Sequence, residues 1–116
     1  MKILITGFDP FDKDKINPSI ELVKKIDEKI DNVQIYKVEI PTVFKKSGEI
    51  LEENIKKIRP DVILCIGQAG GSPSISIERI AINIDDARIA DNLGEKPIDE
   101  KNKSWWRKCL FFKFTN

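Results

Sequence analysis

Residues 44–67, FKKSGEILEENIKKIRPDVILCIG, predict a helix that is followed at once by a buried strand. Apolar or small residues recur in the first part at spacings of three and four, which is typical of a helix packing one stripe against a sheet. These residues are Phe44, Ser47, Gly48, Leu51, Ile55 and Ile58. Pro60 ends the helix, because proline lacks the N–H that a helix needs. Residues 61–66 then read as an interior strand of a parallel sheet, and we expect Cys65 within it to be a buried small hydrophobe.

The residues before this stretch repeat the same order of elements. Residues 2–6 predict a buried strand that Gly7 ends, and Asn17 is the expected N-cap of the helix that follows. The apolar stripe of that helix consists of Ile20, Val23, Ile26 and Ile30. Residues 33–40 alternate as a second strand. Strand, helix, strand, helix, strand is the pattern of a parallel sheet covered by helices, whose carboxyl edge carries the loops after Gly7 and Gly67 and is where ligands bind.

The remaining residues are less regular. Residues 75–84 alternate and predict a further strand, whereas residues 85–100 are polar and predict an ordered loop. The character changes near residue 101, because residues 101–116 hold both tryptophans and three of the six phenylalanines without any periodicity.

The composition excludes several functional classes. With 116 residues, 41% of them hydrophobic and 34% charged, the chain can form one small globular domain. Its formal charge of +1 creates no field that would recruit nucleic acid or an anionic membrane. No apolar run is long enough for a leader peptide or a membrane span, so we expect a cytoplasmic protein without membrane or nucleic-acid partners. The two cysteines lack metal-ligand spacing, and we expect no metal or other cofactor.

Two loops at the predicted carboxyl edge carry candidate binding residues. Phe8 and Phe11 lie on the first loop, where two aromatic rings can clamp a flat small molecule or can simply pack beneath the loop. Both interpretations stay open on the residues alone. The second loop, residues 67–71, lacks the lysine and the spacing of a phosphate-binding loop. Gln68 within it offers a donor and an acceptor, which suits a ligand with an amide group.

Glu78 lies on the predicted strand 75–84, on the face that also carries three isoleucines. A carboxylate there is costly to bury unless it is paired or hydrogen-bonded. Arg79 and Arg88 are candidate partners, so an ion pair of purely structural role is one interpretation. The chain contains no histidine. These 116 residues alone therefore cannot carry out any mechanism that needs an imidazole.

Taken together, three groups of residues resemble the pyroglutamyl peptidase I family. They are GFDPF with NPS, then IPTVFKKSGEILEENIKKIRPDVILCIGQAGG, then ISIERIAINIDDARIADN with its trailing PIDE. The resemblance implies an α/β fold, a three-layer α/β/α sandwich with a mostly parallel sheet, whose C-terminal half is missing here. It also implies a cysteine peptidase with a Cys-His-Glu triad that removes N-terminal pyroglutamate from peptides, uses no cofactor and forms homotetramers at full length.

The same resemblance implies roles for individual residues. Glu78 matches the acid of the triad, which orients the histidine and stabilises its charge. The residues that match substrate-binding positions are Phe8, Phe11, Thr42, Gln68, Arg88 and Ile89. Among these, the phenylalanines hold the flat pyrrolidone ring and Arg88 steadies the oxyanion. No position matches a metal ligand.

The chain departs from the family pattern in three places, one of which is Ser72-Pro73, where a more basic or flexible pair is common. Asp12-Lys13 replaces a Gly-Gly pair, and glycine permits backbone conformations that Asp and Lys resist, so the shape of the first loop is affected. Residues 101–116 replace a Gly-rich turn and an Ala-Tyr-Phe-Ser segment that the family shows before its Cys and His. Codons compatible with these residues spell such a segment when they are read one base out of register.

We therefore expect residues 1–100 to be the N-terminal part of a pyroglutamyl-peptidase-like domain and residues 101–116 to be an out-of-frame tail. Cys109 would then not be the nucleophile, and the chain would lack both that Cys and the His. The resulting expectation is an inactive first half of the enzyme. Two alternatives are a remnant that still binds pyroglutamyl ends, and a small α/β domain whose basic aromatic tail contacts a membrane or nucleic acid.

Overall fold

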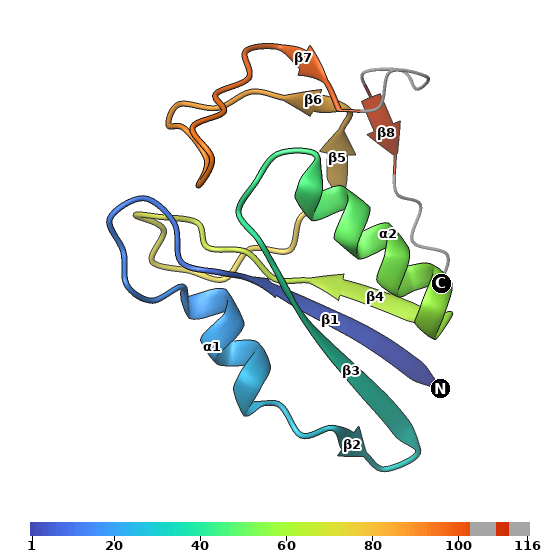
Figure 1. Ribbon diagram of the computed structural model, residues 1–116. Coiled ribbons are helices and arrows are strands. Elements are labelled where there is room, and N and C mark those ends of the chain that lie inside the picture. The colour runs from blue at the N-terminus through green and yellow to red at the C-terminus, as the bar shows by residue number, and fades with distance from the viewer. Residues whose placement is uncertain (103–108, 112–116) are drawn as a thin grey trace.

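The computed structural model describes residues 1–102 and 109–111, with side chains for residues 1–102. Its centre is a four-stranded sheet (Figure 1). The strands are β1 (Lys2–Phe8), β2 (Lys29–Ile30), β3 (Val33–Ile40) and β4 (Val62–Cys65), in the order β2-β3-β1-β4. β1 is parallel to β3 and β4, and β2 is antiparallel to β3. The predicted α/β fold with a mostly parallel sheet is confirmed.

Two helices make the crossovers between the parallel strands. Helix α1 (Pro18–Lys25) connects β1 to β3, and helix α2 (Lys46–Ile58) connects β3 to β4. The two crossovers run in opposite directions across the sheet, and right-handed connections then place the helices on opposite faces (Figure 1). Helix, sheet and helix therefore form three layers.

The start of α1 is the predicted one, but its end is not. Asn17 caps the helix, since its side chain accepts a hydrogen bond from the Ser19 N–H at 3.0 Å. The helix ends at Lys25, and Ile30, which was expected on its apolar stripe, belongs instead to β2. A tight turn with Asp31 at a φ of 50° joins β2 to β3, so a local hairpin takes the place of the last helical turn.

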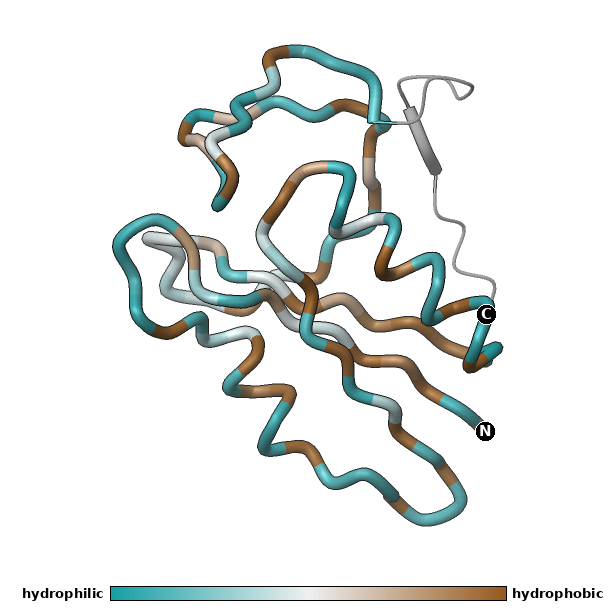
Figure 2. Tube along the Cα trace, viewed as in Figure 1, coloured by the Kyte–Doolittle hydropathy of each residue, from teal (hydrophilic) through white to brown (hydrophobic). Residues whose placement is uncertain are grey.

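The best-covered core lies between α1 and the sheet. Ile5 and Ile35 from β1 and β3 pack there against Ile20 and Val23 of the helix. Leu4, on the opposite face of β1, is also fully buried. Figure 2 shows the hydrophobic residues concentrated along β1 and β4, with hydrophilic residues in the connecting loops. The continuous apolar strands that the sequence predicts are present, and β1 runs two residues past its predicted end, through Gly7 to Phe8.

β4 has the predicted position but not the predicted burial. All four of its residues are exposed, including Cys65, which was expected to be buried. The reason is that β4 is the last strand of its sheet, and α1 packs on β1 and β3 rather than on β4. Within the described part of the chain, no strand pairs with the outer edge of β4.

Residues 75–84 do not form the single strand that was predicted. Residues 75–79 have no regular structure, and Ile75 is 97% exposed. The segment then forms β5 (Ile80–Ile82) and β6 (Ile84–Asp85), which pair antiparallel with β8 (Cys109–Phe111) and β7 (Glu100–Lys101) rather than joining the main sheet. Residues 75–79 are all exposed, so burial does not stabilise the alternating pattern as a strand.

The last predicted segments have mixed outcomes. Residues 86–99 form the expected ordered loop between β6 and β7. The expected change near residue 101 falls largely on residues 103–108 and 112–116, outside those that the structure describes. In the described residues, no helix has both the length and the apolar character needed to cross a membrane.

Candidate functional site at the carboxyl edge of the sheet

The loops that follow β1, β3 and β4 meet at one edge of the sheet, because parallel strands all end on the same side (Figure 1). Phe8 is the last residue of β1, Thr42 follows β3 and Gln68 follows β4. A Cβ atom on Gly67 would lie 3.9 Å from the Phe8 ring, so the ends of β1 and β4 are close together.

Asp9 holds the loops after β1 and β3 together. Its carboxylate Oδ1 accepts from the Thr42 backbone N–H at 2.7 Å, and its carbonyl oxygen accepts from the Thr42 hydroxyl at 3.1 Å. The Asn92 side-chain amide donates to Asp9 Oδ1 at 3.3 Å and to the Pro10 carbonyl at 2.9 Å. Asp9 and Asn92 were not among the predicted site residues. Asp9 stands between Phe8 and Pro10 in the quoted motif, and that position was the only signal of its role.

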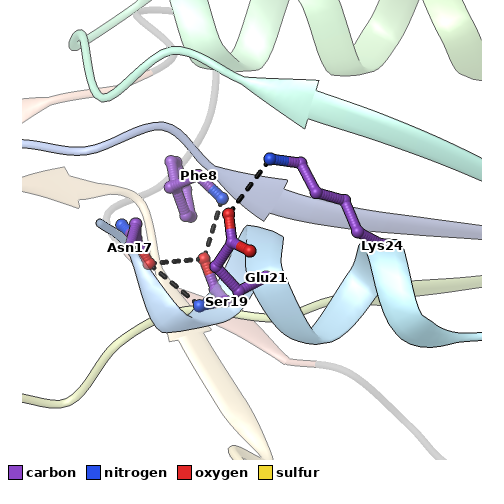
Figure 3. A network of polar contacts seen from close by, with 5 residues as sticks. All are labelled: Phe8, Asn17, Ser19, Glu21 and Lys24. Carbon is purple, nitrogen blue, oxygen red and sulfur yellow. Dashed lines mark hydrogen bonds and ion pairs between the residues drawn. The ribbon is translucent and has the colours of Figure 1, made fainter. Parts of the chain in front are cut away.

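A second network fixes the end of β1 against the start of α1 (Figure 3). The Ser19 hydroxyl accepts from the Phe8 N–H at 2.9 Å and donates to Asn17 Oδ1 at 2.8 Å. The Asn17 amide also donates to the carbonyl of Asp9 at 3.0 Å. Asn17 and Ser19 are both buried, so these bonds replace water and hold the Phe8 backbone in one position.

Asp91 anchors the loop 86–99 to the same edge. Its Oδ2 accepts from the Phe44 N–H at 2.8 Å, and its Oδ1 accepts from the N–H groups of Leu93 at 2.8 Å and Glu95 at 2.9 Å. Desolvation acts to raise the pKa of the Asp91 carboxyl, but the backbone N–H groups together outweigh it and hold the pKa below its usual value.

This lowered pKa predicts how stability depends on pH. The Asp91 carboxylate contributes its full stabilisation above the pKa of an aspartate in the unfolded chain, and the contribution is lost as the pH falls through the lower folded value. Asp91→Asn should therefore lower the urea midpoint at neutral pH, and its difference from the unsubstituted chain should shrink in acid. Urea unfolding over a pH series measures this, with Asp86→Asn as the control. An Asp91→Asn deficit that does not change with pH would contradict the assignment.

A hollow of about 290 Å³ lies between the end of β1, the residues that connect β3 to α2, and the segment from β6 to Asn102. Its lining residues are Phe8, Thr42, Val43, Phe44, Lys45, Ser47, Asp85, Asp91 and Asn102. This volume is at the lower end for small-ligand pockets, of the order of 300 Å³. Among residues 1–102, no three cysteine or carboxylate side chains converge as a metal-ligand set.

The structure brings together only some of the predicted site residues. Phe8 and Thr42 line the hollow, and Phe11 is half-buried on the same loop as Phe8. Four others are exposed and do not line it: Gln68, Glu78, Arg88 and Ile89. Glu78 makes no ion pair with Arg79 or Arg88 among the described residues, so the structural pairing considered for it is not present.

Asp12 stands where the family pattern has glycine, and its backbone conformation is one that glycine adopts easily. Asp12 adopts a φ of 58°, in the left-handed region that glycine enters without strain. Aspartate is one of the few other residues that tolerate this region, because its short polar side chain can bond locally. The loop after Phe11 therefore keeps a conformation of the kind that the expected glycine allows.

Fold and site together define an α/β protein with a small hollow at the carboxyl edge of a doubly wound sheet. A family model described as pyroglutamyl peptidase matches residues 1–107, and the chain belongs to this family. It is 60% identical over 99 residues to a pyrrolidone-carboxylate peptidase of Clostridium perfringens, which covers 85% of this chain and 46% of that one. It is 57% identical over 100 residues to one of Brachyspira hyodysenteriae, with 86% and 50% covered.

Solved structures agree with this assignment. The crystal structure of Bacillus amyloliquefaciens pyroglutamyl peptidase I matches with a TM-score of 0.88 at 43% identity, over 95% of this chain and 54% of that one. A mutant pyrrolidone carboxyl peptidase of Pyrococcus furiosus matches with a TM-score of 0.90 at 44% identity, over 96% and 54%. The chain thus spans about half the length of the relatives it matches, and it corresponds to their N-terminal part.

Proposed function

We propose that this chain supplies the N-terminal half of a peptidase that releases pyroglutamate from the amino terminus of peptides. The observation that carries the proposal is the family match over residues 1–107. The hollow at the carboxyl edge supports it, because the Phe8 ring offers a flat apolar wall of the kind that suits a pyrrolidone ring.

Thr42 lines this hollow and contributes to its shape. Its N–H and hydroxyl both donate to Asp9, and its carbonyl accepts from the Asn92 N–H at 3.0 Å, so both of its donors are already engaged. Donation to the lactam C=O therefore falls to other groups. Gln68 is suited to this, since it carries both a donor and an acceptor at the exposed end of β4.

The chemical step needs groups from outside these 116 residues. A thiol becomes a useful nucleophile when a base takes its proton, and an imidazole does this in a Cys-His-Glu arrangement. The chain has no histidine, while Glu78 provides the acid that would orient one. We infer that this chain alone does not hydrolyse substrate, and that residues beyond it supply the nucleophile and the base.

A fluorogenic pyroglutamyl amide tests this directly. The purified chain should release no fluorophore above the buffer blank. Turnover that disappears on Glu78→Gln or Cys109→Ser would contradict the proposal.

Calorimetry with a pyroglutamyl peptide, and with the matching prolyl peptide as control, tests the alternative of a non-catalytic binding module. Heat with the first peptide only would favour that alternative, and no heat with either would exclude it.

We also infer that the reading frame changes near residue 101. Alignments with curated relatives extend over 99 to 101 of the 116 residues, which supports a break near this point, although the family model matches through residue 107. Resequencing of the gene tests the inference. An open frame that encodes a Cys and a His after one base is removed would support it, and a confirmed sequence with no such frame would overturn it.

A further inference from the structure

Neighbouring residues of β1 and β4 differ sharply in burial although they lie side by side in the sheet. Leu4 is paired in register with Ile63, and their exposed fractions are 0% and 42%. Ile5 is paired with Leu64, with exposed fractions of 5% and 49%. Side chains paired across parallel strands point to the same face, so both faces of the sheet are covered over β1 and uncovered over β4.

Among the described residues no strand pairs with the outer edge of β4, and this free edge lacks the charges and prolines that protect many natural sheet edges. Edge strands are usually short, charged or interrupted by proline, because unpaired N–H and C=O groups recruit other strands. At the opposite edge of this sheet, β2 has two residues and one of them is Lys29. β4 reads Val-Ile-Leu-Cys, without a charge or a proline, and Figure 2 shows it as one of the most hydrophobic parts of the trace. This composition is typical of an interior strand.

The comparison structures indicate what covers such a strand. The Bacillus amyloliquefaciens enzyme shares this fold over 95% of the present chain, but that match accounts for only 54% of its own length. Its remaining residues lie outside the matched part and are available to pack on surfaces that are exposed here. An apolar strand with one unpaired edge is the surface best suited to them.

We propose that β4 is a docking surface for the C-terminal half of a pyroglutamyl peptidase, which pairs with its free edge and covers Ile63 and Leu64. The two halves then associate even when they are separate polypeptides. The inference rests on family membership and on burial, and it is independent of the proposed activity.

Co-expression tests this with a real partner. The tagged 116-residue chain is produced together with the C-terminal half of the Clostridium perfringens relative, which is 60% identical over the matched region. The two polypeptides should co-purify in equal amounts, and the soluble yield of the tagged chain should rise at least threefold. Absence of co-purification, or a yield unchanged from the chain expressed alone, would overturn the proposal.

The exposed thiol of Cys65 reports on β4 without any substitution in that strand. Iodoacetamide labelling followed by peptide mass spectrometry distinguishes Cys65 from Cys109. Labelling of Cys65 should slow at least tenfold in the complex. Equal labelling with and without the partner would show that the partner binds elsewhere. Slow labelling of the chain alone, in a self-associated state, would show that a second copy is the occupant instead.

A matched pair of substitutions locates the surface. Leu64 and Ile30 are both 49% exposed and lie on the opposite edge strands of the same sheet. Leu64→Asp should weaken co-purification at least tenfold, whereas Ile30→Asp should leave it unchanged. Equal effects of the two would overturn the assignment to β4. No substrate enters these measurements, so a stable but inactive complex would count against the proposed function alone.

Discussion

Gly7→Ala should destabilise the protein by about 3 kcal/mol, the upper end for overpacking a tight site. Gly7 is buried near the end of β1, where the strand passes against the first turn of α1. A Cβ atom built on it would lie 2.7 Å from Ile20 Cα, 2.8 Å from Ile20 N and 2.9 Å from Ser19 C. All three are backbone atoms, so no side chain can rotate away and the helix itself would have to move.

Gly48→Ala is the matched control. Gly48 lies in α2, and a Cβ atom there would meet nothing within 4 Å. Alanine is a better helix former than glycine, so this change should stabilise the protein by up to about 1 kcal/mol. Urea unfolding of both variants, with the soluble yield of each, measures the difference. If the two alanines had similar effects, the close approach of β1 to α1 would not exist in solution.

A displaced α1 would also disturb the candidate site. Ser19 accepts from the Phe8 N–H, and Asn17 donates to the Asp9 carbonyl, so the N-cap and the first turn of the helix position the last residue of β1 and the residue after it. Gly7 therefore links the packing of the core to the geometry of the hollow. The GFDPF motif needs its glycine for the close approach of β1 to α1, in addition to any role of Phe8 and Phe11.

Local signals in the sequence were sufficient to predict most strands of the main sheet. β3 has the predicted bounds, and α1 starts at the predicted cap, because alternation and an Asn-Pro pair act over a few residues. Phe8 and Thr42 were assigned to one site only through the family resemblance, and they lie near each other because the strands that precede them are parallel neighbours. The end of α1 was missed because a hairpin turn at Asp31 competes with the continuing apolar spacing.

Local signals could not predict which residues are buried or which residues make contacts across long separations in the chain. An apolar run indicates that a strand is suited to the interior, but the cover must come from other residues, and β4 has none among those described. Asn92 and Asp91 reach loops that are more than 40 residues away in the chain, as the separations of 83 and 47 residues show. No local pattern marks such contacts. The polar residues that hold the hollow together were therefore found only in the structure.

Glu78→Gln should abolish most of the activity of a complex between this chain and the C-terminal half of a relative. Removing the carboxylate that orients the imidazole of a catalytic triad lowers kcat by about 10⁴-fold in a related arrangement. Glu78 is exposed in the present chain, and residues 75–79 lack regular structure, so we expect the partner to order this segment as it binds. We expect kcat to fall by at least 10³-fold and KM to change little, because Glu78 does not line the hollow beside Phe8.

Glu53→Gln provides the control, since it removes the same charge from an exposed position on α2. It should leave kcat, KM and the protection of Cys65 unchanged. Glu78→Gln should likewise leave Cys65 protected, which separates a failure of chemistry from a failure of assembly. A Glu78→Gln complex that is fully assembled and retains more than a tenth of the activity would show that Glu78 does not orient the histidine. The triad acid would then have to come from the other half of the enzyme.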